Sequence, residues 1–151
     1  MKRRILFIML LTFVLAISLV LLNFYLKKRT VETLKNRTKE FVTVWGTYKD
    51  ESSDEYLESI KPSMTIELYE QYQRDAQTII EMKAKYPGSI DSEIKAETIN
   101  LKQSSNKNYI FEAKTTRISK ALKRTKKESV EIIWTKEKVW KISEINAKEE
   151  K

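Results

Sequence analysis

The sequence predicts an α+β protein with an N-terminal transmembrane helix. Three observations predict this class. Residues 5–26 are almost entirely apolar, residues 31–82 repeat apolar side chains at helical spacing, and the residues after Gly88 alternate with a period of two. Helices followed by strands are typical of an antiparallel sheet that is covered on one face by the preceding helices.

The apolar run at residues 5–26 carries three cations at each end. As a helix its 22 residues would reach about 33 Å, which is enough for the ~30 Å hydrocarbon core of a bilayer. A cleaved signal peptide is the alternative, but its apolar core is shorter and ends at small residues. The one small-residue site, Ala16-Ile17-Ser18, lies inside the run, so we expect an uncleaved anchor.

The positive-inside rule gives a tie, because three Lys or Arg stand on each side of the run. A head of four residues cannot fold, and short basic heads usually stay in the cytoplasm. We therefore expect a single-pass protein of the cell membrane with an extracytoplasmic C-terminal domain. The expected parts are a cytoplasmic head (1–4), a transmembrane helix (5–26), a juxtamembrane link (27–30), a folded domain (31–146) and a charged tail (147–151).

The net charge of +8 comes mainly from the ends of the anchor. Six of the 29 Lys and Arg residues stand there, and the charges of the remaining 23 are nearly balanced by 21 Asp and Glu residues. This near balance gives no support to nucleic acid as a partner. The chain has no Cys and no His, which excludes disulfides, thiol and imidazole catalysis and most zinc sites. We predict no enzyme, no cofactor and no metal site.

Three helices are predicted after the anchor. The first has an apolar stripe at spacings of three, four and seven. Pro62 ends a short second helix, and Pro87-Gly88 ends the third. The stripe of the first helix consists of Val31, Leu34, Phe41, Val44, Trp45 and Tyr48.

Four strands are predicted after Gly88. In the first, Ile94, Ala96, Thr98 and Asn100 are expected on one face and Ile99 on the other. The other three strands are expected around residues 109–115, 130–134 and 139–145, with turns at 104–107 and 135–138.

Part of the sequence resembles that of a known protein family. The matching residues are Phe41 to Tyr48, the pair Tyr56-Leu57, then Ile60, Pro62 and Met64-Thr65. This pattern resembles the nuclear transport factor two-like (cystatin-like) fold, and within it the extracytoplasmic domains of VirB-type and conjugation-type assembly proteins of type IV secretion. The closing segment, residues 138–145, is similar to the last strand of that superfamily. The resemblance implies a cone-shaped domain, with three helices on a curved four-stranded sheet.

Aromatic side chains are the first candidate site. At helical or alternating spacing they belong to a core more often than to a ligand pocket, although the mouth of a cone can bind a small molecule. The candidate pocket or interface residues are Trp45, Tyr48, Tyr56, Tyr69, Tyr72, Trp134 and Trp140.

A run of seven cations without an acid, from Lys114 to Lys127, is the second candidate. We expect it at a hairpin tip, either as a solvated loop or as a docking patch for anionic headgroups, wall polymers or an acidic partner. The candidate basic docking patch consists of Arg117, Lys120, Lys123, Arg124, Lys126 and Lys127.

Acidic residues 50–58 are interpreted as caps of the second helix, since the spacing of a calcium loop is missing. Three functions therefore stay open. The first is a membrane-anchored scaffold, an assembly component of a type IV secretion or conjugation apparatus that associates with itself or with envelope and secretion-channel proteins. The second is a binding module for a small apolar or anionic ligand. The third, an enzyme, would need an enclosed carboxylate.

Overall fold

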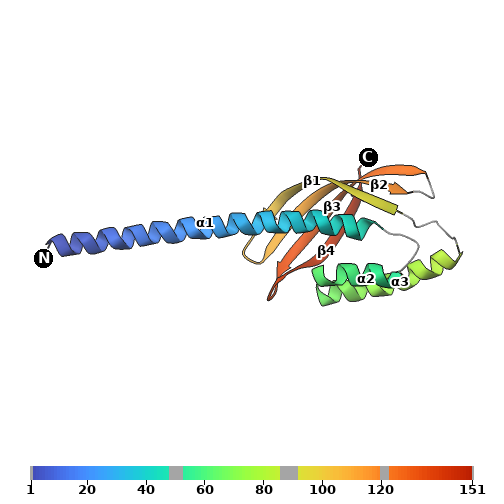
Figure 1. The fold of residues 1–151 in the computed structure, drawn as a ribbon, viewed down its shortest axis with the longest axis horizontal. Helices are drawn as coiled ribbons and strands as arrows, with labels where there is room; N and C mark the ends of the chain where they lie inside the picture. Colours follow the sequence, from blue (N-terminus) through green and yellow to red (C-terminus); the bar gives the residue numbers. More distant parts are fainter. Residues whose placement is uncertain (1, 48–52, 86–91, 120–122, 151) are drawn as a thin grey trace. The chain divides into compact units, whose positions relative to one another are not determined.

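The computed structural model describes residues 2–47, 53–85, 92–119 and 123–150. The chain divides into two compact units, Met1–Thr33 and Leu34–Lys151. The elements in order are α1 (Lys2–Gly46), α2 (Ser53–Ile60), the 3-10 helix η1 (Lys61–Ser63), α3 (Ile66–Lys85), β1 (Ser92–Ser104), β2 (Asn108–Ser119), β3 (Arg124–Lys136) and β4 (Trp140–Glu149) (Figure 1).

The first unit is helical and apolar. By length and composition α1 could span a membrane, because its most apolar stretch has a mean hydropathy of 2.4 and none of it is buried. Side chains such as Leu10, Leu15 and Phe24 are more than half exposed. Residues 27–30, which were expected to form a link, are helical.

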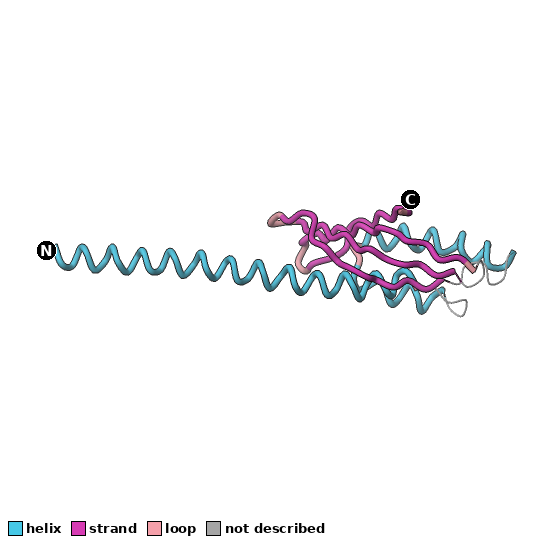
Figure 2. The backbone as a smooth tube through the Cα atoms, turned by 90° about the horizontal axis from the view of Figure 1, so that it is seen from above, coloured by secondary structure: helices cyan, strands magenta, loops and turns pink. Residues whose placement is uncertain are grey.

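The second unit contains an antiparallel sheet in the order β1-β2-β3-β4. Each strand pairs with the next one along the chain, so the sheet is a simple meander; its strands are magenta in Figure 2. This arrangement confirms the predicted α+β class. Both β1 and β4 are longer than expected, and β4 extends to Glu149, into the segment expected to be a charged tail.

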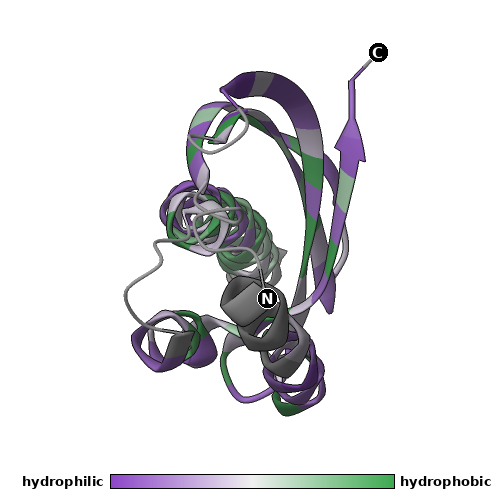
Figure 3. Cartoon of the chain, turned by 90° about the vertical axis from the view of Figure 1, so that its right-hand side faces the viewer, coloured by the Kyte–Doolittle hydropathy of each residue, from purple (hydrophilic) through white to green (hydrophobic). Residues whose placement is uncertain are grey.

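The core lies between the sheet and the helices, which pack on the concave side of the sheet (Figure 3). Alternate residues of each strand point inward, as a half-buried sheet requires. The prediction for the first helix was partly wrong: Val44 is 42% exposed, whereas Val42 is fully buried together with Thr38. The buried strand residues include Phe111, Val130, Ile132, Trp134 and Ile142.

A β-bulge corrects the predicted faces of β1. Ala96 pairs with Thr115 and Thr98 pairs with Lys114, so Glu97 is an extra residue. An extra residue shifts the alternation by one position. Ile99 therefore points into the core together with Ile94, whereas it had been predicted to lie on the opposite face.

The structure also corrects the expected loop at residues 114–127. β2 continues to Ser119 and β3 begins at Arg124, with Thr116 opposite Lys127 and Arg117 opposite Lys126. Most of the cationic run is therefore paired strand. A side chain in a strand points to one face or the other, so neighbouring cations of the run separate onto opposite faces of the sheet.

Contacts with α1 distinguish two ends of this unit. At the Leu34 end, Thr38 contacts Trp134 near the end of β3. The β1–β2 and β3–β4 turns meet at this end, where the amide of Lys136 donates to the carbonyl of Lys107 at 2.8 Å. At the opposite end, Arg117 near the β2–β3 hairpin contacts the carbonyl of Gly46.

Gly46 is packed so closely against β1 that an added side-chain atom would force its neighbours to shift. A Cβ atom built on Gly46 would lie 2.5 Å from the Cβ of Ile94, well inside van der Waals contact. We expect Gly46→Ala to destabilise the domain by about 1–3 kcal/mol through over-packing, measured by thermal unfolding.

The control for Gly46→Ala is Thr43→Ala on the exposed face of the same turn, which should change stability by less than about 0.5 kcal/mol. In an Ile94→Ala background the cost of Gly46→Ala should shrink in part, because two of the three clashing atoms, Cγ2 and Cδ1 of Ile94, are gone while the Cβ remains. Equal costs in both backgrounds would contradict the close packing.

Candidate functional site

Three predicted aromatic residues lie together where α1 ends. The indole Nε1 of Trp45 donates to the hydroxyl of Tyr72 at 2.8 Å, which joins α1 to α3. The hydroxyl of Tyr56 in α2 donates to the carbonyl of Trp45 at 2.7 Å. These bonds tie all three helices together, and they use polar groups that a bound ligand would otherwise contact.

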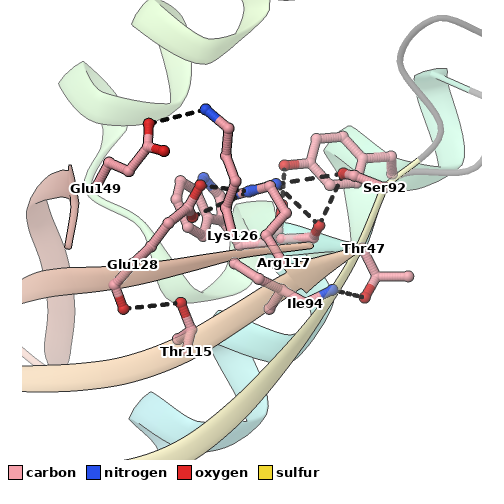
Figure 4. Close-up of polar contacts among 11 residues, drawn as sticks. Thr47, Ser92, Ile94, Thr115, Arg117, Lys126, Glu128 and Glu149 are labelled. Atoms are coloured by element: carbon pink, nitrogen blue, oxygen red, sulfur yellow. Dashed lines mark hydrogen bonds and ion pairs between the residues drawn. The ribbon is translucent and has the colours of Figure 1, made fainter. Parts of the chain in front are cut away.

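Arg117 of β2 completes this group (Figure 4). Its Nε donates to both carboxylate oxygens of Glu128 at 3.0 Å, and the side chains are 25% and 14% exposed. Its Nη1 donates to the carbonyl of Gly46 at 3.3 Å and to the hydroxyl of Ser92 at 3.2 Å. A cation is favourable at the negative end of a helix dipole. Arg117 therefore fastens the end of α1 to three strands.

We call Trp45, Tyr72, Arg117 and Glu128 the aromatic–arginine cluster. The guanidinium of Arg117 lies 5.6 Å from the centre of the Trp45 ring, within the range of a cation–π contact. Its charge is already neutralised by Glu128. The cluster therefore contains no unpaired carboxylate that could act as a base, and its chemistry is that of a structural junction.

Burial raises the pKa of Tyr72 above its ordinary value of 10.0, an effect larger than the opposing one of the hydrogen bond from Trp45. The folded state holds the phenolic proton more strongly than the unfolded chain. The contribution of Tyr72 to the free energy of unfolding should therefore be constant below about pH 10 and fall as the pH rises through the folded pKa.

Absorbance at 295 nm should show a late-ionising tyrosine in the folded protein that is missing in Tyr72→Phe. In denaturant, as a control, every tyrosine of both proteins should ionise near pH 10. Tyr72→Phe should also cost about 1 kcal/mol, because Trp45 loses its acceptor. Persistence of the late phase in the variant would contradict the assignment.

Trp134 lies in the core. It is fully buried, and its Nε1 donates to the hydroxyl of Thr38 at 2.8 Å. The guanidinium of Arg37 lies 4.6 Å from the ring centre. Trp140, which is half-buried, packs edge-to-face on Tyr109 with 5.0 Å between ring centres. Both tryptophans are thus far from the aromatic–arginine cluster in the sheet register.

Tyr69 lies on α3 in a separate contact. Its hydroxyl donates to Glu58 at 3.3 Å, and the ammonium of Lys61 lies 5.3 Å from its ring centre. Tyr48 falls outside the described residues. The six aromatic residues of the set that the structure describes therefore do not surround one space, and the role of the set as a pocket or interface stays a prediction.

The predicted basic patch is divided by the pairing of β2 and β3. Arg117 points inward to Glu128, and Lys126 pairs with Glu149 at 2.8 Å. Lys120 falls outside the described residues. The remaining three, Lys123, Arg124 and Lys127, are exposed, and none of them pairs with an acid of the described segments.

Sequence reasoning missed a charged network on the outer face of the sheet. Lys102 lies 3.2 Å from Glu112 and 3.3 Å from Glu131, and the hydroxyl of Ser129 donates to Glu112. The bonds from Ser129 and Lys102 lower the pKa of Glu112, and the bonds to both glutamates raise the pKa of Lys102. These residues border a hollow of about 320 Å³. Only the strand register, which the sequence does not reveal, brings them together.

The structure places no group of three His, Cys, Asp or Glu side chains where they could hold a metal ion, as far as the described residues extend. The carboxylates above are exposed or paired with cations. The described residues thus form exposed charged surfaces and a rigid junction between helices and sheet.

Comparison with known proteins gives one informative match. No protein-family model matches the chain, and no curated protein matches its sequence significantly. Among solved structures it is similar to CagV, a VirB8 homolog of the type IV secretion system from Helicobacter pylori strain 26695. The match has a TM-score of 0.55 at 13% identity and covers 78% of this chain and 98% of CagV. It confirms the predicted resemblance in fold to VirB-type proteins.

Proposed function

We propose that this protein is a membrane-anchored scaffold of a type IV secretion or conjugative transfer apparatus, with its α+β domain on the extracytoplasmic side. The fold that it shares with a VirB8 homolog carries the proposal. Residues 5–26 would be the anchor, residues 1–4 a cytoplasmic head, and residues 31–146 the domain that meets other subunits.

The exposed apolar helix supports the anchoring. Such a surface is costly in water and stable in lipid, where all its backbone groups bond within the helix. The domain that follows this run has a core of its own and does not bury the run. A membrane would bury it instead.

A role without catalysis fits the site. The buried polar side chains of the folded unit are the threonines Thr38, Thr65 and Thr115, within the described segments. A threonine hydroxyl needs a neighbouring base to become a nucleophile, and Thr38 instead bonds the carbonyl of Leu34 and the indole of Trp134. We propose that the domain acts by binding other proteins, including copies of itself.

Deletion of the gene in its own host tests the proposal. Transfer of DNA or protein through that host's type IV apparatus should fall to background and return when the full chain is supplied. Detergent extracts should contain the protein in complexes with other secretion subunits, identified by cross-linking and mass spectrometry. Normal transfer in the deletion strain would contradict the proposal.

The alternative, a ligand in the cone, depends on aromatic side chains whose polar atoms already have partners in this structure: Trp45 bonds Tyr72, and Trp134 bonds Thr38. It makes a separate expectation, a ligand-dependent rise in melting temperature across lipids, steroids and wall fragments. We give it second place because those polar groups already have partners.

A further inference from the structure

We propose that the turns at the Leu34 end of the domain form a second, peripheral membrane contact that binds anionic phospholipid headgroups of the bilayer holding the N-terminal helix. This proposal rests on the proposed anchoring. We call these residues the proximal basic surface; they are Lys107 in the β1–β2 turn, and Lys136, Lys138 and Val139 in and beside the β3–β4 turn.

The first support is the position of the two turns within the domain. They are joined by the bond from the amide of Lys136 to the carbonyl of Lys107. Two residues before Lys136, Trp134 bonds Thr38, one helical turn after Leu34.

The second support is the length of the tether. Only seven residues, 27–33, separate the apolar run from Leu34. They span about 10 Å as a helix and at most about 25 Å when extended. Whatever orientation the domain takes, the connectivity keeps the Leu34 end, more than any other part, near the lipid surface once the anchor is inserted.

The third support is the chemistry of the surface. Lys107, Lys136 and Lys138 are exposed and form no ion pair with any described acid; Glu137 is the one acid of the β3–β4 turn. Val139, 59% exposed, follows Lys138 at the tip of the tight turn closed by the amide of Glu137 and the carbonyl of Val139. Cations around an exposed apolar side chain suit the headgroup region, where the charge meets phosphate and the apolar group meets acyl chains.

The basic patch predicted from sequence lies at the other end. Its free cations Lys123, Arg124 and Lys127 belong to the β2–β3 hairpin, whose neighbour Arg117 contacts Gly46. Leu34 and Gly46 are about 18 Å apart along α1, which exceeds the Debye length of roughly 8 Å in physiological salt. We call Lys123, Arg124 and Lys127 the distal triple. Because it has the same number of cations but lies away from the Leu34 end, its removal is the matched control for removal of the proximal lysines.

The absence of Cys makes the test direct, because a single introduced Cys can carry a fluorophore. The full chain is reconstituted in vesicles of phosphatidylglycerol or of phosphatidylcholine, labelled at Asn106→Cys in the β1–β2 turn or at Thr125→Cys in the distal hairpin. Spin-labelled lipids quench a fluorophore that lies at the headgroups. We expect strong quenching at residue 106 in phosphatidylglycerol, weak quenching in phosphatidylcholine or in 1 M salt (about 3 Å screening), and weak quenching at residue 125 in both lipids.

The triple variant Lys107→Gln/Lys136→Gln/Lys138→Gln should lower the ratio of docked to undocked domain roughly 100-fold, and Lys123→Gln/Arg124→Gln/Lys127→Gln should leave it unchanged. Equal quenching in both lipids, or loss of quenching by the distal triple alone, would overturn the proposal. Resistance of the same samples to alkaline extraction reports on the anchor separately. A chain that is inserted but not docked would thus refute this inference without refuting the proposed function.

Discussion

Two arginines in the middle of the apolar run, Leu15→Arg together with Leu19→Arg, should release the protein from membranes. Both positions are exposed on α1 within its most apolar stretch. An arginine near the centre of a spanning helix costs about 2.5–3.5 kcal/mol on the insertion scale, so the pair should cost roughly 5–7 kcal/mol. After alkaline extraction the wild-type chain should remain in the membrane pellet and the variant should not.

Leu15→Ala with Leu19→Ala is the matched control, because it shortens the same side chains without adding charge. This control should stay in the pellet. Release of both variants would show that the run is too weak to be an anchor, and retention of the arginine variant would show that something other than this helix holds the protein to the membrane.

Trp134→Ala should produce the largest loss of stability in the folded unit, about 3–5 kcal/mol. The side chain is fully buried between the sheet and α1, and its removal leaves a large cavity and takes away the hydrogen bond that Trp134 donates to the Thr38 hydroxyl. The melting temperature of the full chain in detergent, followed by near-ultraviolet circular dichroism, should fall by roughly 15 °C or more.

Two smaller substitutions separate packing from hydrogen bonding at this site. Thr38→Val keeps the volume but removes the acceptor of the Trp134 Nε1, which should cost about 1–3 kcal/mol. Trp140→Phe, on a half-buried ring, should cost less than Trp134→Ala. Similar melting temperatures for Trp134→Ala and Trp140→Phe would contradict the central position of Trp134.

The order of the elements could be predicted because strong local signals mark them. α2 ends at Ile60, and Pro62 lies within the short 3-10 helix Lys61–Ser63 that follows it. The inward residues of β2 and β3, among them Phe111, Ile132 and Trp134, alternate without interruption. Where the pattern of apolar residues matches the period of the element, sequence and structure agree.

The errors arose where that match fails. The bulge at Glu97 adds one residue and turns Ile99 inward, and nothing local in the sequence marks it. Val42 is buried in place of Val44 because Leu34, Thr38 and Val42 follow one another at four-residue steps on the buried face. This row was missed because Thr38 is polar and interrupts the apolar pattern.

The candidate site was harder to predict because it depends on contacts distant in sequence. Arg117 stood in a run of cations and looked like its neighbours, yet it meets Glu128 and the carbonyl of Gly46 through the pairing of three elements. The network of Lys102 with Glu112 and Glu131 likewise requires the strand register. The sequence lists these residues but does not show which of them pair with one another.

The central claim is that a membrane helix holds the α+β domain outside the cytoplasm, and labelling of a single cysteine tests it most directly. Thr125→Cys places the chain's one thiol on an exposed strand position of the folded unit. Intact cells expressing this full chain are treated with a membrane-impermeant maleimide, and the protein is then recovered from the membrane fraction. We predict complete labelling before lysis; labelling that appears only after the cells are broken open would contradict the account.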